Sequence, residues 1–149
     1  MLIRDVMTES VITASPDCTV REIAELMRER NVGSVVLVEG SQPVGFVTDR
    51  DLAVSVVADG RDYGDHAADH ASAPVITGAP DMDVHEAAEL MVRHGVRRLV
   101  IVDTEELRGI LTLDDLASRT GDADLAHQLS SRVTRAVAPD FFFHERGDA

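Results

Sequence analysis

Two groups of residues in the sequence have the types and the spacing to hold a sugar phosphate. Each group is a glycine, a threonine three positions later and an aspartate three positions after that: Gly45, Thr48 and Asp51 in the first copy, Gly109, Thr112 and Asp115 in the second. The threonine is predicted to be a helix N-cap, where free N–H groups and the helix dipole favour a phosphate oxygen. The aspartate, in the first turn, can accept hydrogen bonds from a sugar diol. The pattern therefore matches a ribose 5′-phosphate.

The same residues also have an explanation that needs no ligand. A threonine N-cap and an aspartate in the first turn stabilise a helix by themselves. The glycine permits close approach either of a ligand or of another stretch of backbone. Ordinary capping does not require this glycine-to-threonine-to-aspartate spacing twice, so the duplication favours a ligand while both explanations stay open.

The two copies belong to a longer internal repeat. Residues 11–53 match residues 75–117 at a constant shift of 64 positions without a gap, with roughly four residues in ten identical. In the first repeat, periodicity predicts a helix over 20–30, a buried strand over 35–38, a strand over 44–48 and a second helix from about Asp49. In the second, it predicts a helix over 84–94, strands over 99–102 and 108–111, and a helix from Leu113. Each repeat is thus strand, helix, strand, strand, helix, which is an α/β (α+β) arrangement.

We divide the chain into four parts on this basis. Residues 1–58 are a first repeat with a lead-in segment, 59–73 a polar linker, 74–120 the second repeat, and 121–149 a C-terminal amphipathic helix followed by a tail. Two units of about 60 residues are each marginal alone, so we expect them to share one core. The tail holds Phe141, Phe142 and Phe143, an apolar triplet that we expect to be buried on a partner chain or on the protein's own surface.

Composition narrows the classes of partner. The net charge is −13, and every basic side chain is arginine because the chain has no lysine. Such a field repels nucleic acid and anionic membranes, so neither is expected, and an anionic ligand must be met by local arginines. Adaptation to high salt and GC-rich codon usage would both produce this bias. No run reaches the roughly 18 apolar residues of a membrane helix, and residues 1–5 lack the basic-then-apolar order of a secretory signal, so a cytoplasmic location is expected. Cys18 has no second cysteine to pair with.

The chain resembles tandem cystathionine β-synthase (CBS) domains, the paired regulatory unit called a Bateman module. The resemblance runs from Val6 to about Thr120 and includes the entry Val-Met-Thr at 6–8, both G-x-x-T-x-x-D stretches and Gly-Val-Arg-Arg-Leu-Val-Ile-Val at 95–102. It implies a β-α-β-β-α fold in each repeat, with the two sheets packed into one pseudo-symmetric module that has two clefts. It also implies an adenosine-containing ligand such as AMP, ADP, ATP or S-adenosylmethionine, with no obligatory cofactor.

The resemblance assigns roles to individual residues. Thr48 and Thr112 would hold phosphate oxygens, and Asp51 and Asp115 the ribose hydroxyls. The remaining assignments are adenine-reading backbone near Ile12, Thr13, Ile76 and Thr77, apolar walls at Val32 and Val96, and phosphate partners at Arg97, Arg98 and Arg50. Arg97 and Arg98 correspond to the uncharged Gly33 and Ser34, so we expect unequal clefts, with tighter phosphate binding where the arginine pair lies. The alternative for that pair is a solvated edge that contacts nearby acids.

No catalytic residues and no metal site are expected, and the protein is not predicted to be an enzyme. His66 and His70 have helical spacing for metal ligands, but a solvated linker explains them better. The leading interpretation is a stand-alone adenine-nucleotide sensor that forms a homodimer and signals to an unidentified protein. The alternatives are an adaptor that binds proteins and has no physiological nucleotide and, more weakly, a residual nucleotide hydrolase.

Overall fold

The computed structural model describes residues 1–73 and 75–138. Within these residues the chain forms two compact units. The first-repeat unit contains Ser10–Val75 with Thr104–Leu107, and the second-repeat unit contains Met1–Glu9, Ile76–Asp103 and the chain from Arg108 onward. The triplet Phe141 to Phe143 lies outside the described residues. None of the helices in the described ranges is long and apolar enough to cross a membrane.

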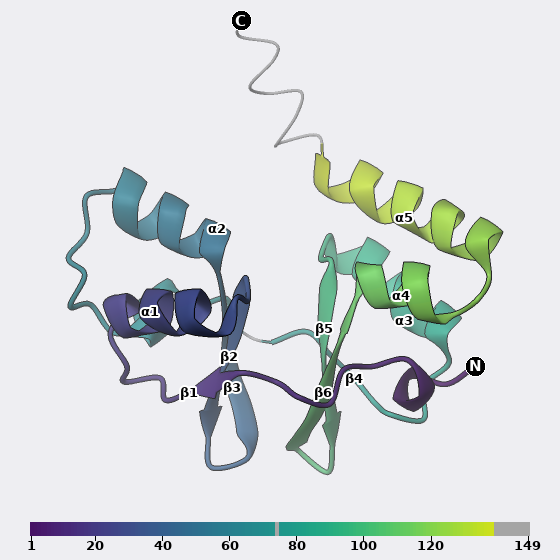
Figure 1. Cartoon of the computed structure of the whole chain (residues 1–149), viewed down its shortest axis with the longest axis horizontal. Helices are drawn as coiled ribbons and strands as arrows, with labels where there is room; N and C mark the ends of the chain where they lie inside the picture. The colour runs from purple at the N-terminus through teal and green to yellow at the C-terminus, as the bar shows by residue number, and fades with distance from the viewer. Residues whose placement is uncertain (74, 139–149) are drawn as a thin grey trace, which may run out of the picture. The chain divides into compact units, whose positions relative to one another are not determined.

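The first-repeat unit is a three-stranded sheet with helices on it (Figure 1). Its elements are β1 (Thr13–Ala14), α1 (Val20–Arg30), β2 (Ser34–Glu39), β3 (Gln42–Thr48), α2 (Asp49–Asp51), the π-helix η2 (Leu52–Ala58) and the 3-10 helix η3 (Ala67–His70). The strand order is β1-β2-β3, with β1 parallel and β3 antiparallel to β2. The helix predicted from Asp49 is therefore α-helical for one turn and continues as a π-helix.

Sequence signals explain where α1 begins and ends. The Thr19 hydroxyl oxygen accepts a hydrogen bond from the Glu22 backbone N–H at 3.1 Å, which satisfies one of the free donors at the helix start. Asn31 ends the helix in the left-handed conformation at φ 53°. Between them, Ile23 and Met27 share a buried face that packs on the sheet. The predicted helix over residues 20–30 has these same bounds.

The second-repeat unit repeats the order and adds a helix at each end. Its elements are the 3-10 helix η1 (Ile3–Asp5), β4 (Thr77–Gly78), α3 (Val84–His94), β5 (Arg98–Asp103), β6 (Glu106–Thr112), α4 (Leu113–Arg119) and α5 (Ala123–Ala138), with strand order β4-β5-β6. The α3 helix begins after Asp83, whose carboxylate accepts from the His85 N–H at 2.8 Å, and ends at Gly95 with φ 62°. The expected C-terminal helix is present as α5.

Each unit has an apolar core of its own among the described residues, and the expectation of one core shared by both stays a prediction. The cluster in the first-repeat unit includes Ile23, Leu37 and Val47, and a separate cluster in the second-repeat unit is built around Leu99 and Leu111. The reason is that each three-stranded sheet receives apolar side chains from a connecting segment as well as from its own helices. Added apolar burial is what a unit of this size lacks by itself.

The connecting segments are exchanged between the repeats. The N-terminal segment, which we grouped with the first repeat, lies on the second-repeat unit, where Thr8 and Ile110 exchange two backbone hydrogen bonds of 2.9 Å. The linker segment lies on the first-repeat unit, where Ser72 and Phe46 exchange backbone bonds of 2.9 and 3.2 Å and Ala67 is fully buried. Each repeat is therefore completed by the segment that precedes the other repeat in the chain.

Candidate ligand-binding site

The two threonine–aspartate pairs lie at helix starts, as predicted. Thr48 accepts from the Asp51 N–H at 3.1 Å, and the Asp51 carboxylate accepts from the Thr48 N–H at 2.8 Å. Thr112 and Asp115 form the same reciprocal capping box at 3.1 and 2.9 Å. These bonds fix both side chains against the end of the preceding strand. The predicted N-cap role of both threonines is confirmed.

Capping leaves each aspartate with unused acceptor capacity. Only Oδ2 of either residue accepts the backbone bond, so Oδ1 keeps its lone pairs. A carboxylate that is oriented by one hydrogen bond can present its other oxygen to a diol without a further loss of side-chain freedom. The arrangement suits the ribose role, while the capping bonds by themselves fulfil the alternative role of helix stabilisation.

The glycine of the motif is explained by packing. A Cβ at Gly109 would lie 2.7 Å from the Thr8 carbonyl oxygen, which is closer than real Cβ contacts. A Cβ at Gly45 would lie 3.2 Å from side-chain atoms of Ala71 and of Leu37. Both glycines therefore make room for neighbouring chain, and in each copy this includes the exchanged connecting segment. Of the two possibilities in the sequence, close approach of a ligand or of the chain itself, the structure shows the second.

One of the predicted arginines lies beside a capped helix start. The Arg97 carbonyl oxygen accepts from the Leu113 N–H at 3.0 Å, next to Thr112, and its side chain is exposed. In the first repeat the Gly33 carbonyl oxygen accepts from the Asp49 N–H at the same distance. Arg98 is half-buried at the start of β5, and Arg50 is exposed. The structure thus brings Arg97 to the second threonine–aspartate pair and places an uncharged residue at the corresponding first-repeat position.

The proposed adenine-side residues lie at the sheet edge of each unit. The carbonyl oxygens of Ile12 and Ile76 are already engaged by N–H groups of β2 and β5, at 3.0 and 3.2 Å. Thr13 and Thr77 are exposed in β1 and β4. Val32 and Val96 are half-buried, immediately after α1 and α3, where their N–H groups bond the helix ends. Each of these carbonyl oxygens keeps a second lone pair, so it can still accept one further hydrogen bond.

The two aspartates differ in their surroundings. Asp115 is 8% exposed, and its Oδ1 lies 3.6 Å from Nε of Arg119. The same guanidinium donates to the carbonyl oxygens of Val6 and Met7 at 3.3 and 3.1 Å. At the position that corresponds to Arg119, the first repeat has Ser55, so Asp51 is half-buried without this arginine. The free carboxylate oxygen of the second-repeat aspartate therefore faces the Arg119 guanidinium.

The first-repeat unit contains a polar network of Ser55, His70, Asp65 and Arg61 that the sequence did not predict. Ser55 donates its hydroxyl proton to the Asp51 carbonyl oxygen at 2.8 Å and lies 2.9 Å from Nδ1 of His70. Nε2 of His70 lies 2.9 Å from Asp65, and Arg61 lies 3.1 Å from the same carboxylate oxygen. The hydrogen bond from His70, followed by the charge of Arg61, lowers the pKa of Asp65 below its ordinary value.

This network ties the linker to η2 through side chains of both segments. The serine hydroxyl can point its single proton at the Asp51 carbonyl oxygen or at Nδ1 of His70, and the tautomer of the imidazole decides which of the two bonds it donates. We expected His66 and His70 to lie in a solvated linker. His66 is exposed, but His70 is only 9% exposed, so that expectation is wrong for His70. Within the part of the chain that the structure describes, no group of three or more His, Cys, Asp or Glu side chains could hold a metal ion.

Comparisons with known proteins identify the family. The CBS domain model matches residues 3–58 and 67–121. The CBS domain-containing protein YhcV of Bacillus subtilis is 42% identical over 115 residues, which are 77% of this chain and 82% of the relative. An uncharacterized protein of Methanopyrus kandleri is 48% identical over 115 residues, which are 75% of this chain and 59% of that protein.

Solved structures agree with the sequence relatives. A CBS domain protein of Pyrobaculum aerophilum, in complex with AMP, superposes with a TM-score of 0.75 at 28% identity and covers 88% of this chain and 99% of its own. A CBS domain pair in complex with 5′-methylthioadenosine and S-adenosylmethionine superposes with a TM-score of 0.71 at 23% identity, over 78% and 93% of the two chains, which supports the fold. The chain is a tandem pair of CBS domains and belongs to the CBS domain family.

Proposed function

We propose that this protein is a regulatory module that binds an adenosine-containing ligand of the AMP, ADP or ATP type and has no catalytic activity of its own. The observation that carries the proposal is the pair of threonine–aspartate capping boxes, one at the same place in each CBS repeat. A family member with AMP bound shares the fold at 28% identity, which supports this class of ligand. S-adenosylmethionine is kept as the second ligand to test.

Each capping box would contact the sugar phosphate part of the ligand. Thr48 and Thr112 would hold phosphate oxygens, and Asp51 and Asp115 would accept from ribose hydroxyls through the oxygen that capping leaves unused. Backbone near Ile12, Thr13, Ile76 and Thr77 would read adenine, with Val32 and Val96 as apolar contacts. Arg98 and Arg50 are further candidates for phosphate contact.

The two repeats should bind with unequal strength. Arg97 supplies a charge beside the second capping box, where the first repeat has Gly33. Conversely, Arg119 already engages Asp115, so a ribose at that carboxylate competes with an internal ion pair that Asp51 lacks. We therefore infer a phosphate preference from Arg97 and a sugar preference from Asp51. Arg97→Ala should weaken ATP more than adenosine.

Binding can carry a signal only if the ligand has unequal affinity for two conformations of the protein. We infer that the module acts in the cytoplasm as a homodimer and passes its ligand state to a protein target. Sedimentation velocity with and without AMP measures the oligomeric state. A monomer under both conditions would remove the homodimer from the proposal and leave ligand binding standing.

The decisive experiment is isothermal titration of the nucleotide-stripped protein with AMP, ATP and S-adenosylmethionine. Asp51→Asn and Asp115→Asn keep an oxygen for the capping bond and remove the charge, so loss of heat in either assigns a site without removing the helix cap. Asp114→Asn is the matched control, because Asp114 is exposed in the same first turn and makes no side-chain cap. Heat that survives in both cap variants would contradict the assigned sites.

A second candidate is an adaptor that binds proteins and uses no nucleotide. It is favoured by an exposed apolar groove in the first-repeat unit that none of the assigned ligand residues lines. No heat with any of the three ligands, in protein shown to be folded by circular dichroism, would favour the adaptor.

A further inference from the structure

The two exchanged connecting segments correspond to each other position by position. At the shift of 64 that relates the repeats, η1 falls on η3. Ile3 and Ala67, which begin these two short helices, are both 0% exposed. The next buried position holds Val6 in one segment and His70 in the other, at 1% and 9% exposure. A valine therefore satisfies the packing at this place in the fold, and the histidine needs another reason.

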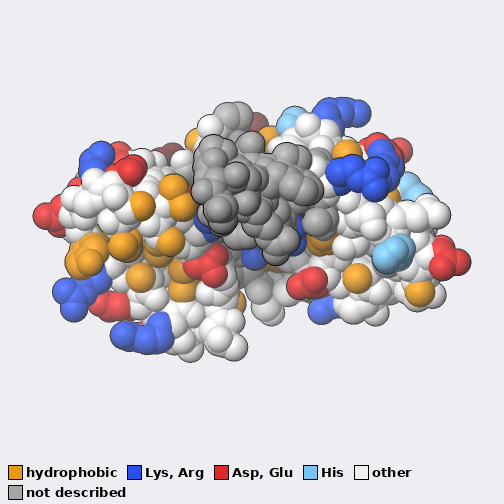
Figure 2. Space-filling model, turned by 90° about the horizontal axis from the view of Figure 1, so that it is seen from above, with side chains coloured by type: hydrophobic (Ala, Val, Ile, Leu, Met, Phe, Trp, Pro, Cys, Tyr) orange, Lys and Arg blue, Asp and Glu red, His pale blue; other side chains and the backbone are white. Residues whose placement is uncertain are grey.

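His70 differs from the other histidines of the described residues in being covered. Its side chain is 4% exposed, whereas that of His85 is 62% exposed. In Figure 2 the histidine side chains that reach the surface lie on the side where Figure 1 draws the second-repeat helices. Within the described part of the first-repeat unit, His70 is the one buried residue that is polar or charged. Its partners, more than water, therefore determine its protonation state.

The partners of His70 come from the linker and from η2. Nε2 of the imidazole lies 2.9 Å from Oδ2 of Asp65, and Nδ1 lies 2.9 Å from Oγ of Ser55. The guanidinium of Arg61 lies 3.1 Å from the same oxygen of Asp65. The imidazole thus lies between a carboxylate, which already has one cation beside it, and a hydroxyl group.

The elements packed on η3 add no further buried charge. These elements are α1, β3 and η2. Neither β3 nor η2 has a titratable side chain, and the charged side chains of α1 are exposed except for the half-buried Glu25, which is paired with Arg21 on its own helix. The other titratable side chains of the linker and of the turn before α1 are the exposed Asp17, Asp59, Asp62, Tyr63, His66 and Asp69 and the half-buried Cys18.

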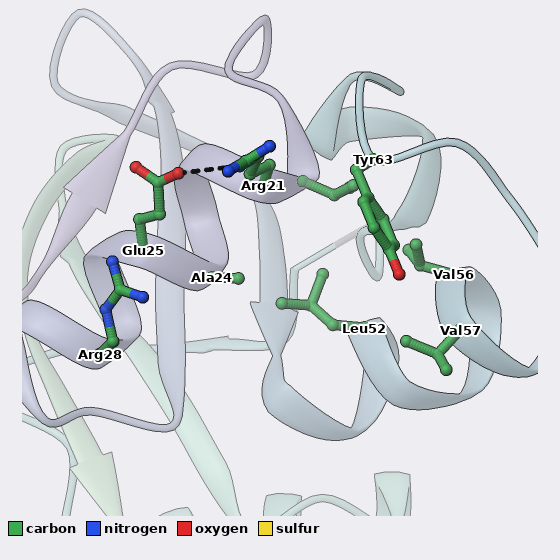
Figure 3. A pocket seen from close by; sticks show the side chains of 9 residues that line it. Arg21, Ala24, Glu25, Arg28, Leu52, Val56, Val57 and Tyr63 are labelled. Atoms are coloured by element: carbon green, nitrogen blue, oxygen red, sulfur yellow. Dashed lines mark hydrogen bonds and ion pairs between the residues drawn. The ribbon is translucent and has the colours of Figure 1, made fainter.

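Ser55 connects the imidazole with the start of the second helix. The η2 side chains that line the apolar groove toward α1 are Leu52, Val56 and Val57 (Figure 3), and Ser55 is not among them. Its hydroxyl oxygen lies 2.8 Å from the carbonyl oxygen of Asp51, one turn back along the chain. From there the chain continues as a π-helix, a form that is frequent at functional sites.

The single hydroxyl proton of Ser55 can serve only one of its two neighbours. When the imidazole is neutral and its proton is on Nε2, directed at Asp65, Nδ1 is an acceptor and takes the bond from the hydroxyl. When the imidazole is charged, Nδ1 donates to Ser55, which then turns its proton to the Asp51 carbonyl oxygen. Both states keep the contact between Ser55 and His70. Only the charged state has the bond to Asp51 and an ion pair with Asp65.

We propose that His70 is a proton-dependent switch that decides whether the linker and Ser55 hold the first turn of the second helix in the first repeat. Protonation adds a charge-assisted bond to Asp65 and turns the Ser55 hydroxyl to Asp51, and loss of the proton removes both. Histidine is the side chain whose charge changes most readily between pH 5 and 8. The second repeat has Val6 and Arg119 at the positions of His70 and Ser55, so it has no such switch.

The switch goes beyond the proposed function and is measured in ligand-free protein. A failed switch therefore leaves the nucleotide sites standing, and a failed nucleotide site leaves the switch. The first measurement is the protonation of both imidazole nitrogens in the full chain between pH 5 and 8, by long-range ¹H–¹⁵N correlation spectra. We expect His70 to change from a charged ring to a neutral ring with its proton on Nε2. A neutral ring with its proton on Nδ1, or no titration in this range, would overturn the switch.

The second measurement is amide hydrogen exchange over the same pH range, expressed as protection factors. Ala67 and Ser72 report on the linker, because their N–H groups bond Cys18 and Phe46 at 2.6 and 2.9 Å. Asp51 reports on the first turn, because its N–H bonds the Thr48 hydroxyl oxygen. Protection at all three is expected to fall by about three- to tenfold as His70 loses its proton.

Three variants separate the parts of the switch. His70→Val, which places a valine where Val6 is buried in the other segment, should abolish the pH response at the linker and at the first turn. Ser55→Ala should keep the response of the linker and lose that of Asp51. His66→Gln is the matched control, because His66 is exposed in the same linker, and it should respond like the wild type. A pH response that persists in His70→Val, or that stays at Asp51 in Ser55→Ala, would overturn the switch.

Discussion

The second helix of each repeat begins with the same capping box but continues differently. After Thr112 and Asp115 the chain forms α4, in which Leu113 and Leu116 are buried and Arg119 reaches the N-terminal segment. After the first-repeat box it makes one α turn and then the π-helix η2, whose exposed side chains include Val54 and Val57. A capping box fixes where a helix starts, and what covers the helix decides how much of it becomes core.

The largest expected difference between the repeats concerns the two matched leucines. Leu116→Ala should lower the free energy of unfolding by about 2–5 kcal/mol, because it empties space in a closed core beneath α5. Leu52→Ala should cost less than half of that, since Leu52 is half-buried beside an open groove. Urea unfolding followed by circular dichroism measures both. Equal losses would mean that the groove is closed in solution.

The motif glycines provide the next comparison. In Gly109→Ala the new methyl group would lie too close to the Thr8 carbonyl oxygen. Because this oxygen accepts a hydrogen bond from the Ile110 N–H in β6, the N-terminal segment must move. We expect a loss of about 1–3 kcal/mol, typical of overpacking. Gly45→Ala meets only side-chain atoms of Ala71 and Leu37 at 3.2 Å, which can yield by a few tenths of an ångström, and should cost less.

Amide hydrogen exchange distinguishes that mechanism from a general loss of stability. The variant Gly109→Ala should speed exchange at Thr8 and Ile110, whose N–H groups form the bonds between the segment and β6. Protection lost evenly over the second-repeat unit would contradict a local clash.

The sequence predicted the repeats, their element order and both capping boxes, because these depend on local signals repeated at a fixed shift. Periodicity and caps gave the bounds of α1 and α3 directly. The exchange of the connecting segments was not predicted, since nothing local in residues 1–9 says on which sheet they pack. The role of the motif glycine also depended on that contact: the sequence shows that something comes close to Gly109, and only the fold identifies Thr8.

The charged positions show the same limit. Arg119 and Ser55 occupy corresponding positions. Arg119 lies four residues after Asp115 on one helix, a spacing that the sequence shows. The bonds of Arg119 to the N-terminal segment and the contact of Ser55 with His70 of the linker become visible only in three dimensions. The apolar walls at Val32 and Val96 and the adenine-reading backbone stay predictions.

The carboxyl of Asp65 in the linker network should make the stability of the first-repeat unit sensitive to acid. Hydrogen bonding from His70 and the charge of Arg61 lower the pKa of Asp65 below 3.8. A carboxyl with a depressed folded-state pKa contributes stability that is present above its unfolded pKa and is lost as the pH falls through the folded pKa. Wild-type stability should therefore fall below about pH 4 more steeply than that of Asp65→Asn, measured by urea unfolding at pH 3 to 6. Parallel curves would remove Asp65 from the network.

The smallest expected difference is between the two glutamates that correspond across the repeats. Glu89 is held by two hydrogen bonds from Arg132 of α5, which lower its pKa, while Glu25 pairs with Arg21 four residues before it on its own helix. Both pairs are exposed, so Arg132→Gln and Arg21→Gln should each lower the free energy of unfolding only slightly. The informative readout is therefore exchange at the α5 amides, which should quicken in Arg132→Gln and stay unchanged in Arg21→Gln. If α5 is equally protected in both, Leu129 and its apolar neighbours hold the helix on α3 and α4 without the ion pair.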